Sequence, residues 1–521
     1  MQTEAITKQF KENIKQLVKK GQLKSAKALL VEYQRMVPKD IEIYSIMGVI
    51  LLIEGNVDEA ESTIHTGLVK EKNDIDLLYN LAYIYEIRGE YLKALETYEN
   101  MVFHMEDTTE RIEMIKVLNE LEDKHRDEIQ RQWEKREDNI KEITFNGKKR
   151  NLHLMYDSQY CDRFIYFVNK YFPNDQHLFI IIVNGKQKLK LMNITNVENV
   201  KVLNLQYDFK KLMHYIDNCS RIFIHYLFDY FCSLMCRFDI KKPIYWPLWG
   251  GDVYNYIDFE LFKPITKDIM QQIGLDVRKR INKNDINYIY RKVTIRKIKK
   301  ILRIDDGDYE KVRDNFITKA ERLDLIYFAP TFYNSKMIEV NFIKKLKSKY
   351  EHIILLGNSA NPTNNHFDIL YKLKKVNSKN FCIIAPLSYG GPEWYIKVLI
   401  NEGTKIFGER FIPLTKYYSA EEYSYILDNV SVCLFAHNRQ QGLGNIWTAI
   451  MLRKKVYLDN KKYTFFKKNG IKVYSINDIN KENIEEITRI SDDLLSSNKK
   501  RLAKLMDIEI IKKYLHDIFD N

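Results

Sequence analysis

The stretch that decides the fold is a polar loop with two glycines, Ala436-His437-Asn438-Arg439-Gln440-Gln441-Gly442-Leu443-Gly444-Asn445. The apolar run at 430–435 before it is typical of a short buried strand, and the run at 446–452 after it is typical of a helix. Glycine lets the backbone approach a ligand closely, and the first turn of a helix carries unpaired N–H groups and a partial positive charge. With Arg439 in the same loop, the stretch is suited to a phosphate or a diphosphate. The alternative is a strand-to-helix turn that needs glycine only for its backbone.

Strand-length and helix-length apolar patterns alternate on both sides of this loop. Before it, strand patterns occur at 152–156, 178–183, 201–205, 221–225 and 243–246. A second set of strands is expected at 325–329, 352–357, 381–386, 405–407, 456–458 and 473–475, with helices between them that include 393–402 and 420–427. This alternation predicts an α/β architecture with two mostly parallel, doubly wound sheets in tandem. Such sheets bind ligands beyond the carboxyl ends of their strands, so we expect the site in the cleft between them.

The N-terminal hundred residues contain a repeat. Gly21, Gly55 and Gly89 are spaced by 34 residues, and the alanines at 26, 60 and 94 have the same spacing. Each glycine lies between two apolar helical runs, a pattern that resembles the tetratricopeptide repeat. Such arrays bind protein segments or mediate self-association and carry no chemistry, so we expect a protein partner or a second copy of the chain there. A structural spacer is the alternative.

The composition is that of a soluble globular protein, with 45% of the 521 residues hydrophobic and 29% charged. No apolar run approaches the ~18 residues of a membrane-spanning helix, and we expect no signal peptide. The six cysteines are scattered without a C-x-x-C pair, which favours a reducing cytoplasm. The net charge of +13 favours anionic partners. Because no nucleic-acid recognition motif supports that class, we expect phosphorylated substrates or an anionic membrane surface.

Polar loops follow two strands of the second set. Gly357, Asn358 and Ser359 come at the end of one strand, and Glu393 closes the loop after the next. A nucleotide-binding domain needs adaptable backbone and polar groups at such strand ends, so these residues are candidates for the same ligand as the glycine loop. The sequence has no strong metal signature, no Walker A loop and no nucleophile elbow.

Two residues of the first set are candidates for a general base. His225 ends one strand, and Asp252 follows Gly250 and Gly251 after the next. An imidazole or a carboxylate there could take the proton of an acceptor hydroxyl. The alternatives are a hydrogen-bonded histidine near the core and an aspartate that stabilises a turn.

Three motifs together carry a resemblance to a known family. They are Trp246-Pro247-Leu248-Trp249-Gly250-Gly251-Asp252-Val253-Tyr254, Leu356-Gly357-Asn358-Ser359 and Arg439-Gln440-Gln441-Gly442-Leu443-Gly444. In this order and spacing they resemble the TDP-N-acetylfucosamine:lipid II N-acetylfucosaminyltransferase (4-alpha-L-fucosyltransferase) family, over roughly residues 150 to 480. The resemblance implies a B-type glycosyltransferase (GT-B) fold of two Rossmann-like domains, no obligatory metal, and inversion at the transferred sugar.

The resemblance also implies roles for the candidate residues. A TDP- or UDP-linked sugar would lie in the C-terminal domain, against Gly357, Asn358, Ser359, Glu393, Arg439, Gln441, Gly442, Gly444 and Asn445. The helix start would contact the diphosphate, and Arg439 would stabilise the charge of the leaving nucleotide. The other domain would supply the base, with Asp252 preferred to His225.

The expected domains are tetratricopeptide repeats at 1–108, a capping helix and connector at 109–145, the acceptor-side domain at 146–322 and the donor-binding domain at 323–521. The predicted enzyme transfers a sugar, by the resemblance N-acetylfucosamine-like, to a lipid-linked glycan. A protein acceptor recruited by the repeats and a non-catalytic scaffold are the alternatives.

A basic stretch at 278–303 has eleven basic residues against Asp285 and interleaved apolar positions. An amphipathic basic segment binds anionic leaflets, so we expect contact with the inner face of the plasma membrane from the cytoplasm. A solvated basic helix and linker is the alternative.

Overall fold

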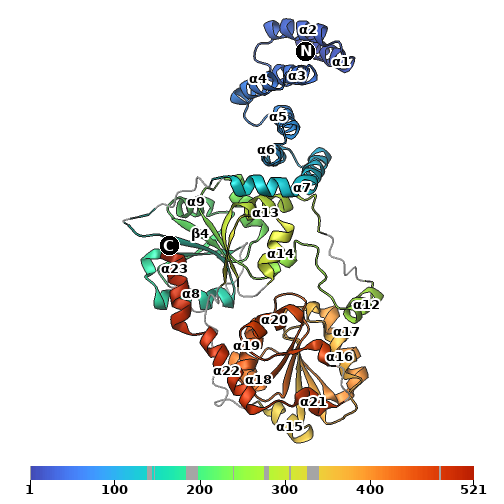
Figure 1. Ribbon diagram of the computed structural model, residues 1–521, viewed down its shortest axis with the longest axis vertical. Helices are drawn as coiled ribbons and strands as arrows, with labels where there is room; N and C mark the ends of the chain where they lie inside the picture. Colours follow the sequence, from blue (N-terminus) through green and yellow to red (C-terminus); the bar gives the residue numbers. More distant parts are fainter. Residues whose placement is uncertain are drawn as a thin grey trace.

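The computed structural model describes residues 2–137, 144–145, 147–183, 197–238, 240–274, 281–303, 307–324, 340–479 and 483–520. An all-helical N-terminal region projects from two domains, each built on a parallel sheet with helices on both faces (Figure 1). The predicted fold class of two doubly wound domains behind a helical region is therefore confirmed. Among the described helices, none has the length and apolar character that crossing a bilayer requires.

Residues 2–137 form seven helices: α1 (Gln2–Lys19), α2 (Leu23–Met36), α3 (Glu42–Ile53), α4 (Val57–Lys70), α5 (Ile75–Ile87), α6 (Tyr91–His104) and α7 (Thr109–Lys135). The repeat glycines lie in the turns between paired helices, where Gly21, Gly55 and Gly89 have φ of 71°, 83° and 71°. That left-handed backbone is one glycine adopts without strain, and it explains the spacing of the glycines. The assignment to the tetratricopeptide family stays a prediction.

The first sheet has the order β3-β2-β1-β4-β5-β6-β7, with every pair parallel. Its strands are β1 (Asn151–Tyr156), β2 (His177–Val183), β3 (Val200–Asn204), β4 (Arg221–Ile224), β5 (Ile244–Pro247), β6 (Ile298–Arg303) and β7 (Glu321–Asp324). Its helical segments are α8 (Gln159–Tyr171), η1 (Asn174–Gln176), α9 (Phe209–Asp217), α10 (Asp229–Arg237), α11 (Gly251–Tyr254), α13 (Ile286–Lys297) and α14 (Asp308–Asn315). The strand order reverses between β1 and β4, which places a binding crevice beyond their carboxyl ends.

The second sheet has the order β10-β9-β8-β11-β12-β13, again parallel throughout. Its strands are β8 (His352–Leu356), β9 (Phe381–Pro386), β10 (Phe411–Leu414), β11 (Val432–Phe435), β12 (Lys455–Leu458) and β13 (Tyr474–Ser475). The helical segments of this part of the chain are α15 (Asn341–Lys349), η3 (Pro362–Asn364), α16 (His366–Leu373), α17 (Glu393–Phe407), η4 (Gly408–Arg410), α18 (Ala420–Asp428), α19 (Leu443–Met451), α20 (Asn460–Lys468), η5 (Ile476–Asp478), α21 (Ile484–Thr488) and α22 (Asp492–Leu505). The order reverses between β8 and β11, the strand that leads into the glycine loop.

One predicted strand is wrong. Residues 405–407 belong to the last turn of α17, and the edge strand is instead β10. Tyr395, Leu399, Gly403 and Phe407 are buried at a spacing of four, so the helical stripe continues through the apolar residues that suggested a strand. The strand expected at 325–329 lies outside the described residues.

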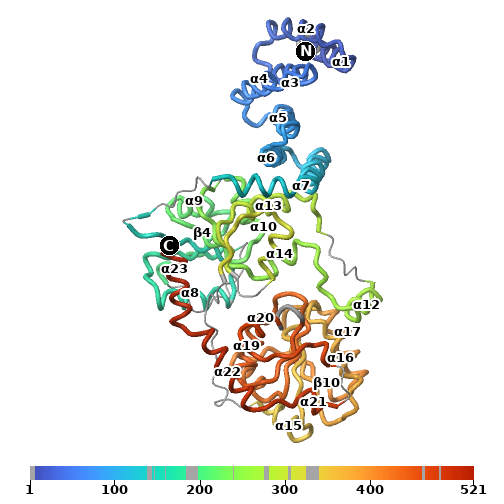
Figure 2. The backbone as a smooth tube through the Cα atoms, viewed as in Figure 1, coloured from blue at the N-terminus to red at the C-terminus, as the bar shows by residue number. Residues whose placement is uncertain are grey.

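Two segments cross between the domains (Figure 2). Helix α12 (Pro264–Gln272), expected in the first domain, packs on α16, where the Asp368 carboxylate accepts hydrogen bonds from Ile265 N, Thr266 N and Thr266 Oγ1 at 3.0, 2.9 and 2.6 Å. Helix α23 (Ile508–Asp520), expected in the second domain, packs its apolar face on the first sheet. An acidic side chain near a helix start stabilises α12 in this position. The two domains are thus tied together by exchanged helices.

The basic stretch at 278–303 does not lie on the surface where its described part, 281–303, can be followed. On α13, Arg291, Lys292 and Arg296 are 0%, 8% and 4% exposed. Lys292 Nζ lies 2.5 Å from a carboxylate oxygen of Glu122, and Arg296 is ion-paired with Glu99. Helix α13 therefore packs against α6 and α7. The prediction that this helix faces a membrane is wrong. Residues 278–280 lie outside the described residues.

Candidate functional site

The glycine loop folds over the carboxyl ends of the second sheet and leads into α19. Gly442 has φ of 67°, and a Cβ there would lie 3.0 Å from Asn358 Oδ1 and 3.2 Å from His437 Cε1. Both the backbone and the close approach therefore require glycine at this position. Gly444, in the first turn of α19, has no atom within 4 Å of the place its Cβ would take. Gly444 is also exposed, so the first turn of the helix is open to solvent at this residue.

Asn364 ties this loop to the end of β8. Its side chain is fully buried, and Oδ1 accepts from Asn358 N at 3.0 Å and lies 2.7 Å from His437 Nε2. Its Nδ2 donates to the carbonyl of Ser359 at 3.0 Å. A Cβ on Gly357 (φ 72°) would lie 2.8 Å from Asn364 Oδ1, so this glycine also leaves room for the amide. One side chain thereby holds both strand ends in a fixed geometry.

Gln441 and Tyr389 extend the same network. Thr363 Oγ1 donates to Gln441 Oε1 at 2.5 Å, and Gln441 Nε2 donates to Asn358 Oδ1 at 3.4 Å. Asn358 Nδ2 lies 3.5 Å from the Tyr389 hydroxyl, which also has a hydrogen bond with the side chain of Asn445. Burial raises the pKa of Tyr389, so its hydroxyl stays protonated at neutral pH.

The structure thus brings together most of the predicted donor residues, namely Gly357, Asn358, Ser359, Gln441, Gly442 and Asn445. Glu393 stands apart from them, exposed in the first turn of α17 and ion-paired with Lys397 at 2.8 Å. Sequence reasoning missed Asn364, His437 and Tyr389. The available signal for Asn364 was the length of the polar run at 358–366, longer than a turn requires.

Arg439 points from the glycine loop toward the first domain. Burial lowers the pKa of its guanidinium, against the opposing influence of Tyr226, Tyr254 and Asp308. The two domains approach each other closely beside it, since a Cβ on Gly250 would lie 3.2 Å from the Gln440 carbonyl oxygen. A partly desolvated cation between two sets of strand-end loops is suited to an anionic ligand in the cleft.

Asp252 is buried in the loop after β5, with 1% of its surface exposed. Its Oδ2 accepts from Trp246 Nε1 at 2.7 Å and from Leu227 N at 3.1 Å, and its Oδ1 accepts from Trp249 N at 3.0 Å. Burial raises its pKa in spite of these three donors. The carboxylate therefore holds the loop that faces Gln440, as the turn-stabilising alternative anticipated.

His225 lies in the interior of the first domain. Its Nε2 is 3.1 Å from His153 Nδ1, and His153 Nε2 is 3.1 Å from His177 Nδ1. Burial lowers the pKa of His225 to about 3, so it is neutral at physiological pH. The ring of Phe519 from α23 covers this row, 4.4 Å from the ring centre of His177. The geometry matches the core-histidine alternative.

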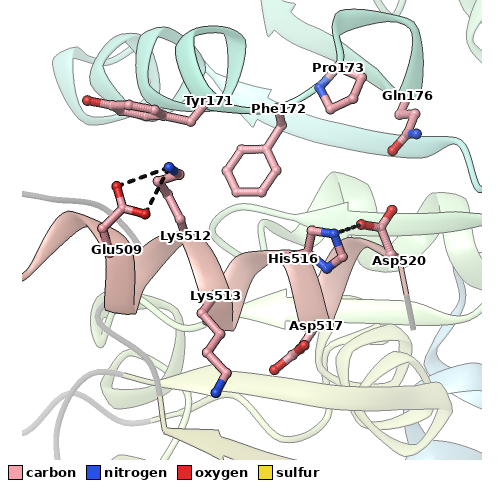
Figure 3. A pocket seen from close by; sticks show the side chains of 10 residues that line it. All are labelled: Tyr171, Phe172, Pro173, Gln176, Glu509, Lys512, Lys513, His516, Asp517 and Asp520. Carbon is pink, nitrogen blue, oxygen red and sulfur yellow. Dashed lines mark hydrogen bonds and ion pairs between the residues drawn. The ribbon is translucent and has the colours of Figure 1, made fainter.

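A hollow of about 410 Å³ lies elsewhere, between the end of α8 and helix α23 (Figure 3). Two pairs of its charged groups are close together, Lys512 with Glu509 at 3.0 Å and His516 with Asp520 at 3.2 Å. None of the predicted site residues lines it. The strand-end loops where the two domains meet, and not this hollow, form the candidate functional site.

Residues 274–507 match the model of a family described as 4-alpha-L-fucosyltransferase, glycosyl transferase group 56. This match covers the end of the first domain and nearly all of the second. Several solved structures are also similar to the chain. A mutant O-GlcNAc transferase from Thermobaculum terrenum is 10% identical and matches 100% of this chain and 97% of its own, with a TM-score of 0.45.

HepE from Anabaena, in complex with UDP and glucose, is 10% identical over 71% of this chain and 99% of its own, with a TM-score of 0.48. Sucrose-phosphate synthase from Thermosynechococcus elongatus is 11% identical over 71% of this chain and 98% of its own, again with a TM-score of 0.48. The family match includes the polar strand-end loops of the second domain, at residues 357–364 and 437–445. Residues 274–507 of the chain are thus similar to a glycosyltransferase family, and the chain folds into two Rossmann-like domains with parallel sheets.

Proposed function

We propose that the chain transfers an N-acetylfucosamine-like sugar from a TDP- or UDP-linked donor to a lipid-linked glycan, with inversion at the sugar. The description of the matching family, a 4-alpha-L-fucosyltransferase, supports the sugar class. The enzyme would work in the cytoplasm, at the inner face of the plasma membrane where such an acceptor is found. Between residues 124 and 521 the chain has 68 basic and 47 acidic residues, a charge balance that favours an anionic leaflet.

The observation that carries the proposal is the open start of α19 within the network centred on Asn364. The diphosphate would lie against the N–H groups of Gly444 and Asn445, where the partial positive charge of the helix favours an anion. Arg439 would add a full charge as the nucleotide leaves. Because these groups can neutralise the diphosphate, we propose that no resident metal is needed. Transfer should then survive exhaustive treatment with EDTA, and loss of transfer that Mg²⁺ restores would contradict this part.

The proposed base is Asp252, in preference to His225. An inverting transfer needs a group that takes the proton of the acceptor hydroxyl as the sugar is attacked. The raised pKa of Asp252 makes it a better proton acceptor than an ordinary carboxylate, and its loop faces Gln440 across the cleft. To act, its Oδ1 must exchange the hydrogen bond from Trp249 N for one from the acceptor.

A thermal-shift panel of nucleoside diphosphates tests the donor class. We expect UDP or TDP to raise the melting temperature of the whole chain, because a ligand that binds only the folded state stabilises it. Arg439→Ala should reduce the affinity and the transfer rate at least tenfold, about 1.4 kcal/mol, with little change in the melting temperature of the free protein. No shift with any nucleoside diphosphate in the wild type would overturn the proposal.

A second candidate, transfer to a protein acceptor, is favoured by the charge of the helical region. Residues 42–123 contain 19 acidic and six basic residues. On α5, Tyr79, Tyr83 and Ile87 are 44%, 49% and 52% exposed and share one face at a spacing of four. An acidic face with exposed aromatic rings is suited to a lysine- or arginine-rich partner segment.

The two acceptors can be separated with one variant. The double substitution Tyr79→Ala and Tyr83→Ala should leave transfer to a lipid-linked acceptor unchanged if the helical region only binds a partner. If the acceptor is a protein recruited there, the same variant should raise the KM for that protein without changing nucleotide binding.

A further inference from the structure

Four aromatic side chains gather where the loops of the two domains meet. Tyr160 begins α8, Trp249 follows β5, Tyr389 follows β9, and Tyr417 lies between β10 and α18. Tyr160, Tyr389 and Tyr417 are 49%, 50% and 71% exposed, although large aromatic side chains are usually buried. Tyr160 and Trp249 belong to the acceptor-side domain, and Tyr389 and Tyr417 belong to the donor-side domain.

Two rings of this group are in contact within the acceptor-side domain, and the third is near them. The ring centres of Tyr160 and Trp249 are 5.5 Å apart, with their planes at 54°. Tyr389 is near enough to both Tyr160 and Tyr417 for their charges to affect the pKa of its hydroxyl. The Tyr389 hydroxyl points toward the Asn358 side chain, and half of the Tyr389 side chain is exposed. The ring therefore lies at the edge of the predicted donor-binding residues.

Two further contacts hold the acceptor-side pair in place. The backbone N–H of Trp249 donates to Asp252 Oδ1 at 3.0 Å, which places Trp249 beside the proposed base in the free enzyme. Asp252 and Tyr160 both act on the pKa of Tyr156, so all three lie in one neighbourhood. The adjoining Gly250 lies against the second domain, since a Cβ added to it would be 3.2 Å from the Gln440 carbonyl oxygen. The pair is therefore preorganised beside the site of reaction.

Accessible aromatic rings near a carboxylate, such as the exposed Tyr160 and the half-buried Trp249 near Asp252, are suited to a pyranose. One face of a pyranose ring presents C–H groups that carry partial positive charge, and the face of an aromatic ring carries partial negative charge. Stacking on Tyr160 and Trp249 would direct the hydroxyls on the ring edge toward Asp252. A nucleobase could also stack on these rings, but the predicted donor-binding residues belong to the second domain, whereas Tyr160 and Trp249 belong to the first.

We propose that Tyr160 and Trp249 form the subsite for the acceptor's terminal pyranose, with Tyr389 closing it from the donor side. The proposal rests on the proposed function, since it takes the donor to occupy the second domain. It assigns Tyr160 and Trp249 to acceptor specificity and gives them no part in nucleotide binding. Loss of the pair should weaken the acceptor and leave the donor unaffected.

The test is saturation-transfer difference NMR on the whole protein with the methyl glycosides of glucose, galactose, mannose and N-acetylglucosamine. We expect at least one of them to receive saturation mainly at its ring C–H protons. Tyr160→Ala should reduce that signal at least fivefold, while Tyr160→Phe, which keeps the ring, should retain it. The matched control is Tyr166→Ala, because Tyr166 is on the same helix, is 66% exposed, and lies about 240° around the axis.

Calorimetry with UDP and TDP on the same variants separates the two proposals. Unchanged nucleotide affinity in Tyr160→Ala, with its circular dichroism intact, supports an acceptor subsite. Ring signals absent for all four glycosides, or equally reduced by Tyr160→Ala and Tyr166→Ala, would overturn the inference while nucleotide binding stands. Loss of UDP and TDP binding in Tyr160→Ala would reassign the rings to the nucleobase and also overturn it. Failure of the wild type to bind any nucleotide would instead refute the proposed function.

Discussion

At the scale of single residues, the predicted donor-binding loops depend on the Asn364 side-chain amide, which both accepts and donates hydrogen bonds. Asn364 accepts two hydrogen bonds at Oδ1 and donates from Nδ2 to the carbonyls of Ser359 and Asn361, at 3.0 and 2.9 Å. An asparagine satisfies such a mixed set, whereas a carboxylate can only accept. The identity of this residue, and not only its polarity, is therefore required by the structure.

Asn364→Asp places a second acceptor oxygen against two backbone carbonyls in a buried position. We expect the free energy of unfolding to fall by about 2 kcal/mol, the scale of a buried polar group without its partner, and UDP or TDP binding to weaken with it. Denaturant unfolding and calorimetry measure the two effects. Asn438→Asp is the control, since Asn438 donates one exposed hydrogen bond to the Glu260 carbonyl at 3.1 Å. Equal effects of the two substitutions would contradict the role of Asn364.

The proposed base has a pH signature. Because the pKa of Asp252 is raised by burial, its ionised form is lost at a higher pH than for an ordinary carboxyl as the solution is made acidic. The kcat profile should therefore have an acid limb displaced upward. Asp252→Asn should lower kcat by roughly a hundredfold and remove that limb, with donor affinity retained. His225→Ala should keep the limb, and the opposite pattern would reverse the two roles.

The sequence was enough to predict several site residues but not what holds them. Gly357, Asn358, Gln441 and Gly442 follow predicted strands, and strand ends are where ligands of such sheets bind. The partner that joins them was not predictable, because Asn364 and His437 are 73 residues apart in sequence and only the folded sheet brings them together. For Asp252 and His225 the sequence left both readings open, since neither burial nor hydrogen-bond partners can be read from residue type.

At the scale of elements, α13 joins the helical region to the first domain through buried charge. Arg296 and Glu99 are each 4% exposed or less, and Lys292 Nζ donates a hydrogen bond to Asn119 Oδ1 at 3.0 Å. Burial raises the pKa of Glu99 to about 7, and Arg296 opposes this shift by stabilising the ionised carboxylate. A buried carboxylate that loses its cationic partner is strongly destabilising.

Arg296→Met should therefore lower the free energy of unfolding by about 3 kcal/mol at pH 7.5. The double variant Glu99→Met with Arg296→Met should be more stable than the single one, because no unpaired buried charge remains. Denaturant unfolding measures both. Arg136→Met is the control, since its pair with Glu96 is half exposed and should contribute about 0–1 kcal/mol. A double variant less stable than the single one would contradict a buried ion pair of this kind.

The elements themselves were largely predictable, and two of the errors have clear physical causes. Residues 405–407 continue the helical stripe of α17, so a local apolar run was taken for a strand. The basic stretch at 278–303 was interpreted as a membrane surface because its acidic partners were invisible. Glu99 lies 197 residues before Arg296, and its carboxylate is brought to α13 only by the docking of α6.

At the scale of the whole molecule, the exchanged helices fix how the two domains face each other. Helix α23 reaches back to the first sheet, where Asn151 Nδ2 lies 3.4 Å from the Phe519 carbonyl oxygen. Beneath it the rings of His153, His177 and His225 are neutral, because burial lowers their pKa values. Protonation of these histidines would therefore disfavour the packing of α23 on the first sheet.

Stability should fall as the pH decreases below about 6.5, the ordinary pKa of histidine, because the unfolded chain then binds protons that the buried row does not. His177, with a pKa of about 3 in the folded state, contributes one of these protons. His177→Phe should reduce the slope of unfolding free energy against pH by up to about 1.4 kcal/mol per pH unit between pH 6 and 5. Identical slopes for the variant and the wild type would exclude this linkage.

The central claim, that the open start of α19 holds the donor diphosphate, is tested most directly by calorimetric titration of Gly444→Asp with UDP and TDP. No atom lies within 4 Å of the would-be Cβ, and an acidic residue in the first helical turn is favourable, so the melting temperature should be unchanged or higher. The added charge would repel a diphosphate bound there. We predict at least a hundredfold loss of affinity in Gly444→Asp and a smaller loss in the neutral Gly444→Asn. Undiminished UDP and TDP binding in a folded Gly444→Asp protein would contradict the account.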